Sequence, residues 1–433
     1  MKDKKTELIE ITELRIGMYV ELDIDWMAHP FLKGSFKISS SKQLDAVRSL
    51  GLSHVRYVAE YSDVLPERLL NVTPSVLPSL NDQELQAVEQ ARAEMQRQRQ
   101  LRSDRMAAQQ RSLLACEKRF AEAVRLYRQA SERVMVSPRG SAEICSDLIG
   151  KFIQDLAQEG DATIRLLSEC PGDRMSMHPV NVTILALLLA RAMGMPAYEM
   201  QHLGMACLLH DIGKLELPDR VRWYEENFSS TEYKLYQQHV SESLQLARKM
   251  DLSPLTQLAI AQHHELVDGA GFPSRARGDS MPLSSKILAL VNRYDDLCNP
   301  GWPATAMTPH EALSFIFAQN KNRYDGVVIS AFIRMMGVYP PGSVIELLDG
   351  RHALVVSVNS SRPLKPRVIV HDTAVPRHEA QILDLEQAPE IGIRRSVKPA
   401  TLSSEAIDYL MPRQRICYFY EQVAAQDELA GAV

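Results

Sequence analysis

Apolar residues recur at helical spacing through the middle of the chain, from about residue 141 to residue 339. This pattern predicts a succession of amphipathic helices, and we expect an all-α domain here. One stretch, 180–190, is almost entirely apolar, but it is about half as long as a membrane span and indicates a buried helix. The predicted helices are 141–159, 163–168, 179–193, 196–209, 231–249, 254–263, 284–297 and 309–318.

The first part of the chain has a different pattern. Residues 9–58 show short β-type runs with turns at Arg15-Ile16-Gly17 and Lys33-Gly34. They also contain a helical piece at 41–50 and a strand at 54–58. We therefore expect a small α+β domain over residues 1–70.

The next segment predicts a long helix or a helical hairpin. After the proline-containing stretch 66–80, residues 81–136 are rich in Gln, Arg, Glu and Ala and contain neither Gly nor Pro. A homodimer stalk or a signalling connector is one use of such a helix. The alternative is a solvated helix packed on its own domain, and the irregular apolar heptad does not decide between them.

The last part of the chain alternates between apolar and polar residues. Three β-type runs follow Pro340-Pro341-Gly342, at 344–348, 352–358 and 367–370, while the residues after Gln426 are expected to fray. The fold class is therefore mainly α, with accessory β elements. The expected domains are 1–70 (α+β), 71–137 (helical linker), 138–340 (all-α) and 341–433 (β-rich appendage).

Composition narrows the class of protein. The net charge of −5 and the pI of about 6.2 do not suggest binding to DNA, although a nucleotide-sized ligand is compatible with them. No segment resembles a signal peptide or a membrane span. The six cysteines are widely separated without a CxxC pair, which favours reduced thiols and a cytoplasmic location.

Candidate chemistry is concentrated in the helical region. Five of the 12 histidines form a suggestive arrangement there, as His178, the pair His210-Asp211, His239 and the pair His263-His264. A single histidine on a helix is more often a core or surface residue than a ligand, but this clustering favours a metal site. Imidazole and carboxylate suit Fe, Mn and Zn, and a carboxylate next to a histidine can bridge two ions. Asp295, in another apolar helix, would need a partner if it is buried.

The motifs around these residues resemble the HD-GYP family, a subdivision of the HD phosphohydrolase superfamily, over roughly residues 140–339. The resemblance rests on isolated His239 and on three motifs: LLHDIGKLELPD (208–219), HHELVDGAGFP (263–273) and RYDDL (293–297). The second is similar to the family signature HHExxDGxGYP. The first sixty residues, with ITELRIGMYVELD, are similar to the small uncharacterised domain that often precedes HD-GYP in bacterial proteins.

The resemblance implies an all-α fold, a metal centre of two or three ions, commonly iron or manganese, and hydrolysis of the bacterial second messenger cyclic di-GMP. It implies catalytic roles for Lys214, which would contact the phosphate, and for Asp211, which would bridge the metals. The signature loop would shape one edge of the substrate site or bind a signalling partner. The implied metal ligands are His178, His210, Asp211, His239, His263, His264 and Asp295, and the loop residues are Glu265, Asp268, Gly269, Gly271, Phe272 and Pro273.

Several positions depart from the family pattern. Phe272 replaces the tyrosine of GYP, and Asn292 stands where many relatives have Asp. Arg174 occupies the place of the glutamate that holds a third metal, so we expect two ions, with Asp173 as the nearest substitute carboxylate. The arginine-bearing segment that holds substrate phosphates is missing, because the chain has no arginine between Arg293 and Arg323.

Three hypotheses follow from this pattern. The first is a metal-dependent phosphodiesterase that converts cyclic di-GMP to linear pGpG and onward to GMP. The second is a catalytically weak or inactive receptor or scaffold that binds a cyclic dinucleotide. The third is an HD phosphohydrolase of another nucleotide. Independently of the choice between them, Lys321 or Arg323 is the substitute expected for the missing arginine.

Overall fold

The computed structural model describes residues 6–22, 31, 35–50, 52–64, 82–158, 162–168, 170–225, 227–359, 362–373, 375–388 and 390–422. The chain divides into two compact units, Met1–Leu101 and Arg102–Val433. The predicted turn at Lys33-Gly34, the stretch 66–80 and the tail after Gln426 lie outside the described residues.

The first unit contains an antiparallel sheet with strand order β1-β4-β2-β3. Its core is formed by side chains such as Ile9, Val20, Val55 and Tyr57, and Val47 of α1 packs with them. The Ser40 hydroxyl caps α1 by accepting from the Gln43 amide, as expected at a helix start. These elements confirm the predicted α+β pattern, and their bounds are β1 (Thr6–Glu10), β2 (Tyr19–Glu21), β3 (Ser35–Lys37), α1 (Ser41–Arg48) and β4 (His54–Val58).

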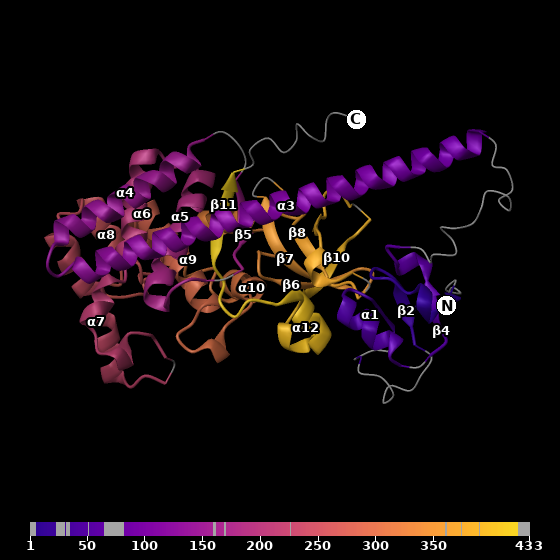
Figure 1. The fold of residues 1–433 in the computed structure, drawn as a ribbon. Helices are drawn as coiled ribbons and strands as arrows, with labels where there is room; N and C mark the ends of the chain where they lie inside the picture. Colours follow the sequence, from indigo (N-terminus) through magenta and orange to yellow (C-terminus); the bar gives the residue numbers. More distant parts are fainter. Residues whose placement is uncertain are drawn as a thin grey trace. The chain divides into compact units, whose positions relative to one another are not determined.

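The predicted long helix is α3 (Asp82–Arg133). Its C-terminal half packs in the second unit, where Phe120 and Tyr127 are buried. The other helices of this unit are α4 (Pro138–Leu156), α5 (Arg174–Ala192), α6 (Ala197–Leu209), α7 (Ser230–Lys249), α8 (Pro254–Gln262), α9 (Leu283–Cys298), α10 (Pro309–Gln319), α11 (Gly326–Met336) and α12 (Ser404–Leu410). Figure 1 shows α4 to α9 gathered in one helical group.

Helix α5 lies at the centre of this group. It is long and apolar enough to cross a membrane by composition, but 83% of its apolar window is buried inside the protein. Every residue from Ser176 to Ala190 is buried. A helix that is apolar on all sides and covered on all sides is a core helix, as the sequence predicted.

One strand between α4 and α5 and the strands that follow α11 form one sheet. The order is β10-β6-β7-β5-β11, and β8 pairs with β7 and β9. The predicted runs near 344, 352 and 367 are confirmed as strands. The bounds are β5 (Ala162–Leu166), β6 (Val344–Leu347), β7 (His352–Asn359), β8 (Arg367–Val370), β9 (Ile382–Asp384), β10 (Ile393–Val397) and β11 (Tyr418–Gln422).

One predicted helix was wrong. Residues 163–168 were expected to be helical, but they fall largely in strand β5, which pairs antiparallel with β11 and β7. The partners lie far along the chain, so local spacing carried no signal for them, and the β-branched Thr163 and Ile164 suit a strand.

The helices and the sheet share one hydrophobic core, in which Val344, Leu354 and Phe419 pack with residues of α4 and α5. The four-part division of the chain stays a prediction, while the mainly α fold class is confirmed.

Candidate metal centre

The candidate ligands come from the ends and inner faces of five helices. His178 lies in the first turns of α5, and His210 and Asp211 follow directly after α6. His239 is buried on α7, and His263 and His264 follow α8. The structure therefore brings together six of the seven predicted metal ligands.

Backbone carbonyl groups fix the orientation of three imidazoles. The Nδ1 atoms of His210, His239 and His263 each lie within hydrogen-bond distance of the carbonyl oxygen three residues earlier, at 2.7, 2.5 and 2.6 Å. A carbonyl oxygen only accepts, so this network assigns the proton to Nδ1. Each Nε2 atom is left with a free lone pair that points into the centre.

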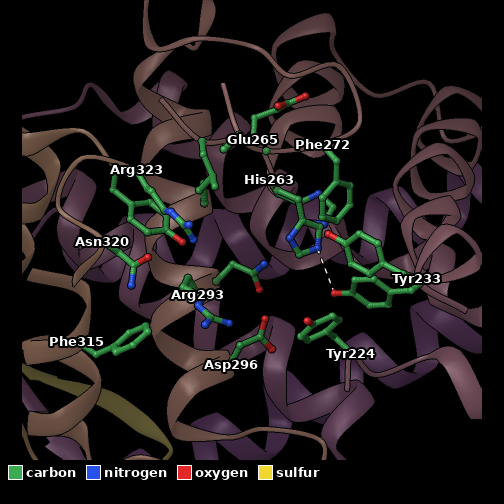
Figure 2. Close-up of a pocket in the computed structure, with 18 residues that line it drawn as sticks. Tyr224, Tyr233, His263, Glu265, Phe272, Arg293, Asp296, Phe315, Asn320 and Arg323 are labelled. Carbon is green, nitrogen blue, oxygen red and sulfur yellow. Dashed lines mark hydrogen bonds between the residues drawn. The ribbon is translucent and has the colours of Figure 1, made fainter. Parts of the chain in front are cut away.

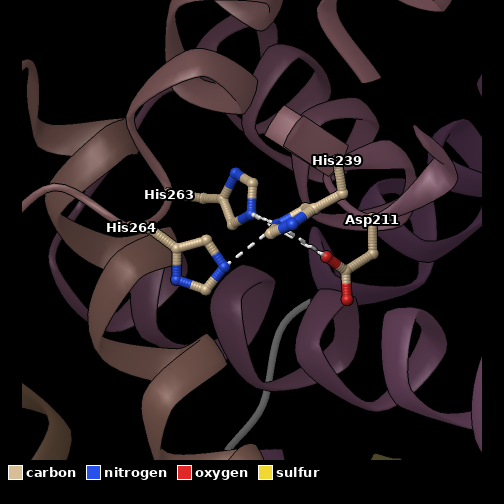
Figure 3. Close-up of side chains that lie close together, drawn as sticks. All are labelled: Asp211, His239, His263 and His264. Atoms are coloured by element: carbon tan, nitrogen blue, oxygen red, sulfur yellow. Dashed lines mark hydrogen bonds and ion pairs between the residues drawn. The ribbon is translucent and has the colours of Figure 1, made fainter. Parts of the chain in front are cut away.

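The Nε2 atoms of the candidate histidines lie around Asp211, and Figure 3 shows His239, His263 and His264 of this set. The shortest approaches to its carboxylate are 3.6 Å from His178, 3.5 Å from His210, 3.5 Å from His239 and 3.8 Å from His263. His239 Nε2 also lies 3.1 Å from the Nε2 atoms of both His263 and His264. In the His239–His263 pair both Nδ1 atoms carry the protons, so neither Nε2 atom has a hydrogen to donate to the other.

This donor set fits metal ions. Asp211 Oδ1 is buried without a hydrogen-bond partner, and the lone pairs around it need a cation. The ligand atoms form two groups, each lying within 4.8 Å: His178, His210 and Asp211 in one, and Asp211, His239, His263 and His264 in the other. Because Asp211 belongs to both groups, its carboxylate is placed to bridge two ions.

The protonation states of the four residues in the second ligand group suit metal binding. Burial lowers the pKa of His239 to about 4 and lowers the pKa of His263 and His264 well below the ordinary value. Burial alone would raise the pKa of Asp211, but Lys214 and His210 outweigh burial and hold that pKa well below its usual range. Neutral imidazoles and an ionised carboxylate are the forms that bind metal.

Asp295 is placed differently from the other predicted ligands. It belongs to neither ligand group, and its Oδ2 atom lies 2.5 Å from His178 Nδ1, on the side of the ring away from Asp211. On the opposite side, Asn292 Oδ1 lies 3.0 Å from His178 Nε2. Asn292 therefore presents its carboxamide to the ligand group, while Asp295 is in a position to orient the imidazole.

Lys214 lies inside the centre rather than in solvent. Its Nζ atom donates to Asp211 Oδ2 at 2.5 Å, and the residue is only 3% exposed. The ammonium also lies 4.7 Å from the centre of the Trp223 ring. Sequence reasoning did not single out Trp223, since no spacing or motif distinguishes it.

Arg174 lies beside the centre, at the start of α5. Its guanidinium pairs with Asp296 at 2.8 Å and stacks on Trp223 at 4.0 Å. Asp173, the substitute carboxylate suggested by the sequence, instead caps α5 by accepting from the Ser176 amide. A cation therefore occupies the place next to Asp296.

The signature loop is held by its own residues. Glu265 is fully buried and accepts from the backbone amides of Ser274 and Ala276 at 2.6 and 3.0 Å. Asp268 accepts from the Ala270 amide. A Cβ on Gly271 would lie 2.5 Å from the His264 carbonyl oxygen, so only glycine fits there.

Two loop residues complete the turn. Gly269 has a φ of +80°, which favours glycine, and Pro273 follows Phe272 through a cis peptide bond. The Phe272 ring stacks on His264 with 4.6 Å between ring centres. The ring that replaces the family tyrosine therefore lies directly against a candidate ligand.

A pocket of about 320 Å³ opens beside the histidines. Figure 2 shows Phe315, Asn320 and Arg323 on one side of it and Tyr224, Tyr233 and Phe272 on the other. The remaining lining residues are Tyr236, His263, His264, Glu265, Leu266, Ala270, Gly271, Ala289, Asn292, Arg293, Asp296 and Tyr324. Of the two substitutes suggested for the missing arginine, Arg323 lines the pocket and Lys321 does not.

Six cysteines were expected to be reduced. Four of them, Cys116, Cys145, Cys207 and Cys298, are free and buried. Cys170 and Cys417 instead form a disulfide across 247 positions of sequence. The expectation of reduced thiols was therefore wrong for this pair, because neither residue has a partner nearby in the sequence.

Two family models match different parts of the chain. Residues 155–328 match the HD domain family, and residues 7–143 match a domain of unknown function, DUF3391. A cyclic di-GMP phosphodiesterase of Pseudomonas aeruginosa is 27% identical over 394 residues, which cover 88% of this chain and 89% of the relative.

Two further comparisons match less closely. A 3'3'-cGAMP-specific phosphodiesterase 2 of Vibrio cholerae is 30% identical over 122 residues, which cover 28% of this chain and 23% of the relative. A solved structure of an HDG"Y"P protein from Bdellovibrio bacteriovorus covers 76% of this chain and 98% of its own, with 15% identity and a TM-score of 0.41. Residues 155–328 are similar to HD domains and residues 7–143 to DUF3391 domains, in line with the resemblance to HD-GYP proteins.

Proposed function

We propose that this protein is a metal-dependent phosphodiesterase that hydrolyses cyclic di-GMP to linear pGpG and onward to GMP. The observation that carries the proposal is the convergence of unprotonated Nε2 atoms on the Asp211 carboxylate, next to a pocket that contains arginines. The relative that spans most of the chain has the same named activity.

The two ligand groups around Asp211 would hold metal ions, and such ions would supply an activated water and polarise a phosphoryl oxygen. The protein's own residues orient the substrate around them. Lys214 is a buried cation beside Asp211, so its ammonium stabilises the negative charge that develops on the phosphoryl oxygens. Trp223 covers that ammonium and limits its contact with water.

The pocket suits a nucleotide with two phosphates. Arg293 and Arg323 line it, and a guanidinium binds phosphate through two parallel hydrogen bonds. The rings of Tyr224, Tyr233 and Phe272 provide surfaces on which a purine base can stack. Arg323 thereby takes the role of the arginine missing after Asp295.

The proposed centre would hold two ions rather than three, and iron or manganese would suit it. Imidazole and carboxylate ligands are compatible with both metals. A third ion is disfavoured because the Arg174 guanidinium, paired with Asp296, lies where a further carboxylate would be needed. Asp295 completes the centre by holding His178, and its role as a direct ligand stays a prediction.

The proposal also includes two protein–protein contacts. We propose that α3 provides a homodimer contact. The signature loop, built around Gly269 and Gly271, is the surface proposed for a signalling partner.

The test combines metal analysis with turnover. Protein purified without oxygen and loaded with iron or manganese should contain two ions per chain and cleave cyclic di-GMP. His210→Ala and Asp211→Ala should abolish turnover, whereas His54→Ala in the first unit should leave it unchanged. Metal-loaded wild-type protein that stays inert would overturn the proposal.

The same experiment separates the alternatives. Tight binding of cyclic di-GMP without turnover would select the receptor or scaffold. Faster cleavage of 3'3'-cGAMP than of cyclic di-GMP in a substrate panel would select a phosphodiesterase of another cyclic dinucleotide, and the partial relative from Vibrio cholerae is the reason to include that compound.

A further inference from the structure

A buried polar network lies behind His178. Asp295 Oδ2 contacts His178 Nδ1, and Asp295 Oδ1 accepts hydrogen bonds from the side-chain amides of Asn181 and Asn299. The exposed fraction of these four residues is between 0 and 4%. The carboxylate that orients His178 is therefore itself held from two sides.

The two asparagines are held in turn by the backbone just before and within β11. The Asn299 side chain donates to the Ile416 carbonyl oxygen at 2.8 Å and accepts from the Ile416 amide at 2.8 Å. Asn181 donates to the same carbonyl oxygen at 3.2 Å and accepts from the Tyr418 amide at 2.9 Å. Each carboxamide thus has both ends occupied in a single orientation.

The backbone that holds them is firmly attached to the helical group. Cys417 lies between these two residues and forms the disulfide with Cys170. The Cys417 carbonyl oxygen accepts from the Leu167 amide at 3.0 Å, and the Tyr418 hydroxyl lies 3.0 Å from that of Tyr294. This segment lies far beyond the residues that match the HD domain, 155–328.

We infer that the C-terminal segment Ile416–Tyr418 is part of the metal centre's support, and that Asn181 and Asn299 are positioning residues that act through Asp295 on His178. The inference rests on the proposed metal centre. The network contacts His178 of one ligand group, but it does not contact His239, His263 or His264 of the other. Loss of the network should weaken one ligand group and spare the other.

The test replaces Asn299 with a residue of the same shape. In Asn299→Asp the side chain still accepts from the Ile416 amide but no longer donates to Asp295 or to the Ile416 carbonyl oxygen. Metal affinity at the His178 group should fall roughly 10- to 100-fold, the usual effect of losing an outer partner of a ligand. Dialysed protein should then retain about one ion per chain, and excess metal should restore the second.

A double-mutant cycle shows which ligand group loses metal affinity. Asn299→Asp should weaken metal binding when combined with His263→Ala, but should add nothing to His178→Ala. The charge-matched control is Asn227→Asp, which is exposed and should retain both ions. Asn181→Asp provides the second variant should Asn299→Asp fail to fold, as judged by thermal unfolding.

The outcomes separate this inference from the proposed function. Folded Asn299→Asp that keeps both ions at wild-type affinity, or that weakens both ligand groups equally, overturns the inference. Wild-type protein that binds two ions but does not cleave cyclic di-GMP overturns the proposed function and leaves the inference standing.

Discussion

Asn292 is a neutral residue within the candidate centre. Its Oδ1 atom lies on the ligand side of His178, where a carboxylate would add a negative charge. In Asn292→Asp we expect metal affinity at the His178 group to rise roughly tenfold, since opposite unit charges about 4 Å apart attract by about 1–4 kcal/mol between water and a partly screened protein site. Metal titration of the apoprotein measures this change. The control is Asn320→Asp, which charges the pocket wall away from the ligands, and equal gains in both variants would contradict the prediction.

Lys214 provides the second test at the scale of single residues. Lys214→Met keeps much of the side-chain volume but removes the ammonium beside Asp211. Turnover should fall about 100-fold, because a preorganised charge partner of the phosphoryl oxygens is lost, while two ions per chain remain bound. Steady-state kinetics and metal analysis of the same samples check both parts. Lys249→Met, at the exposed end of α7, should leave both quantities unchanged.

At the scale of elements, the contact between η4 (Ile212–Glu216) and α7 depends on one glycine. A Cβ on Gly213 would lie 2.3 Å from the Ser243 amide nitrogen and 2.4 Å from the His239 carbonyl oxygen. Gly213→Ala should therefore push α7 away, lower the melting temperature and reduce metal content. Gly150→Ala on α4 is the matched control, because its Cβ meets nothing within 4 Å, and it should stabilise the helix by about 0.5–1 kcal/mol. Gly213→Ala that retains full metal content would contradict the packing described.

The disulfide also links separate elements, joining the segment before α5 to the one that enters β11. Cys170→Ser should lower the free energy of unfolding of oxidised protein by about 2–4 kcal/mol, as typical for a disulfide that closes a long loop. Chemical denaturation with and without dithiothreitol measures the loss. Reduced wild-type protein serves as the control and should match the variant. A wild-type protein whose stability is insensitive to the reductant would contradict the prediction.

The parts of the centre that sequence predicted are those set by local structure. His210 and His263 each bond a carbonyl three residues earlier, so one helical turn fixes the ring, and the motif carries the geometry. The placement of Asp295 could not be predicted in this way, because the sequence does not show which ring nitrogen of His178 its carboxylate contacts. The β5 strand and the disulfide depend on residues beyond 350, and no local pattern encodes such distant partners.

At the scale of the whole molecule, the metal centre ties together the helices of the second unit, whereas the first unit contains none of its candidate ligands. Chelation should therefore lower the free energy of unfolding of the second unit by about 2.7 kcal/mol for each ion removed, relative to protein with free metal at 100 times Kd. Hydrogen exchange should accelerate at the ends of α6 and α8, where His210 and His263 each lose the ion of their own ligand group. Exchange in Met1–Leu101 is the internal control and should not change. Equal acceleration in both units would mean that the metal does not act through these ligands, since only the second unit holds them.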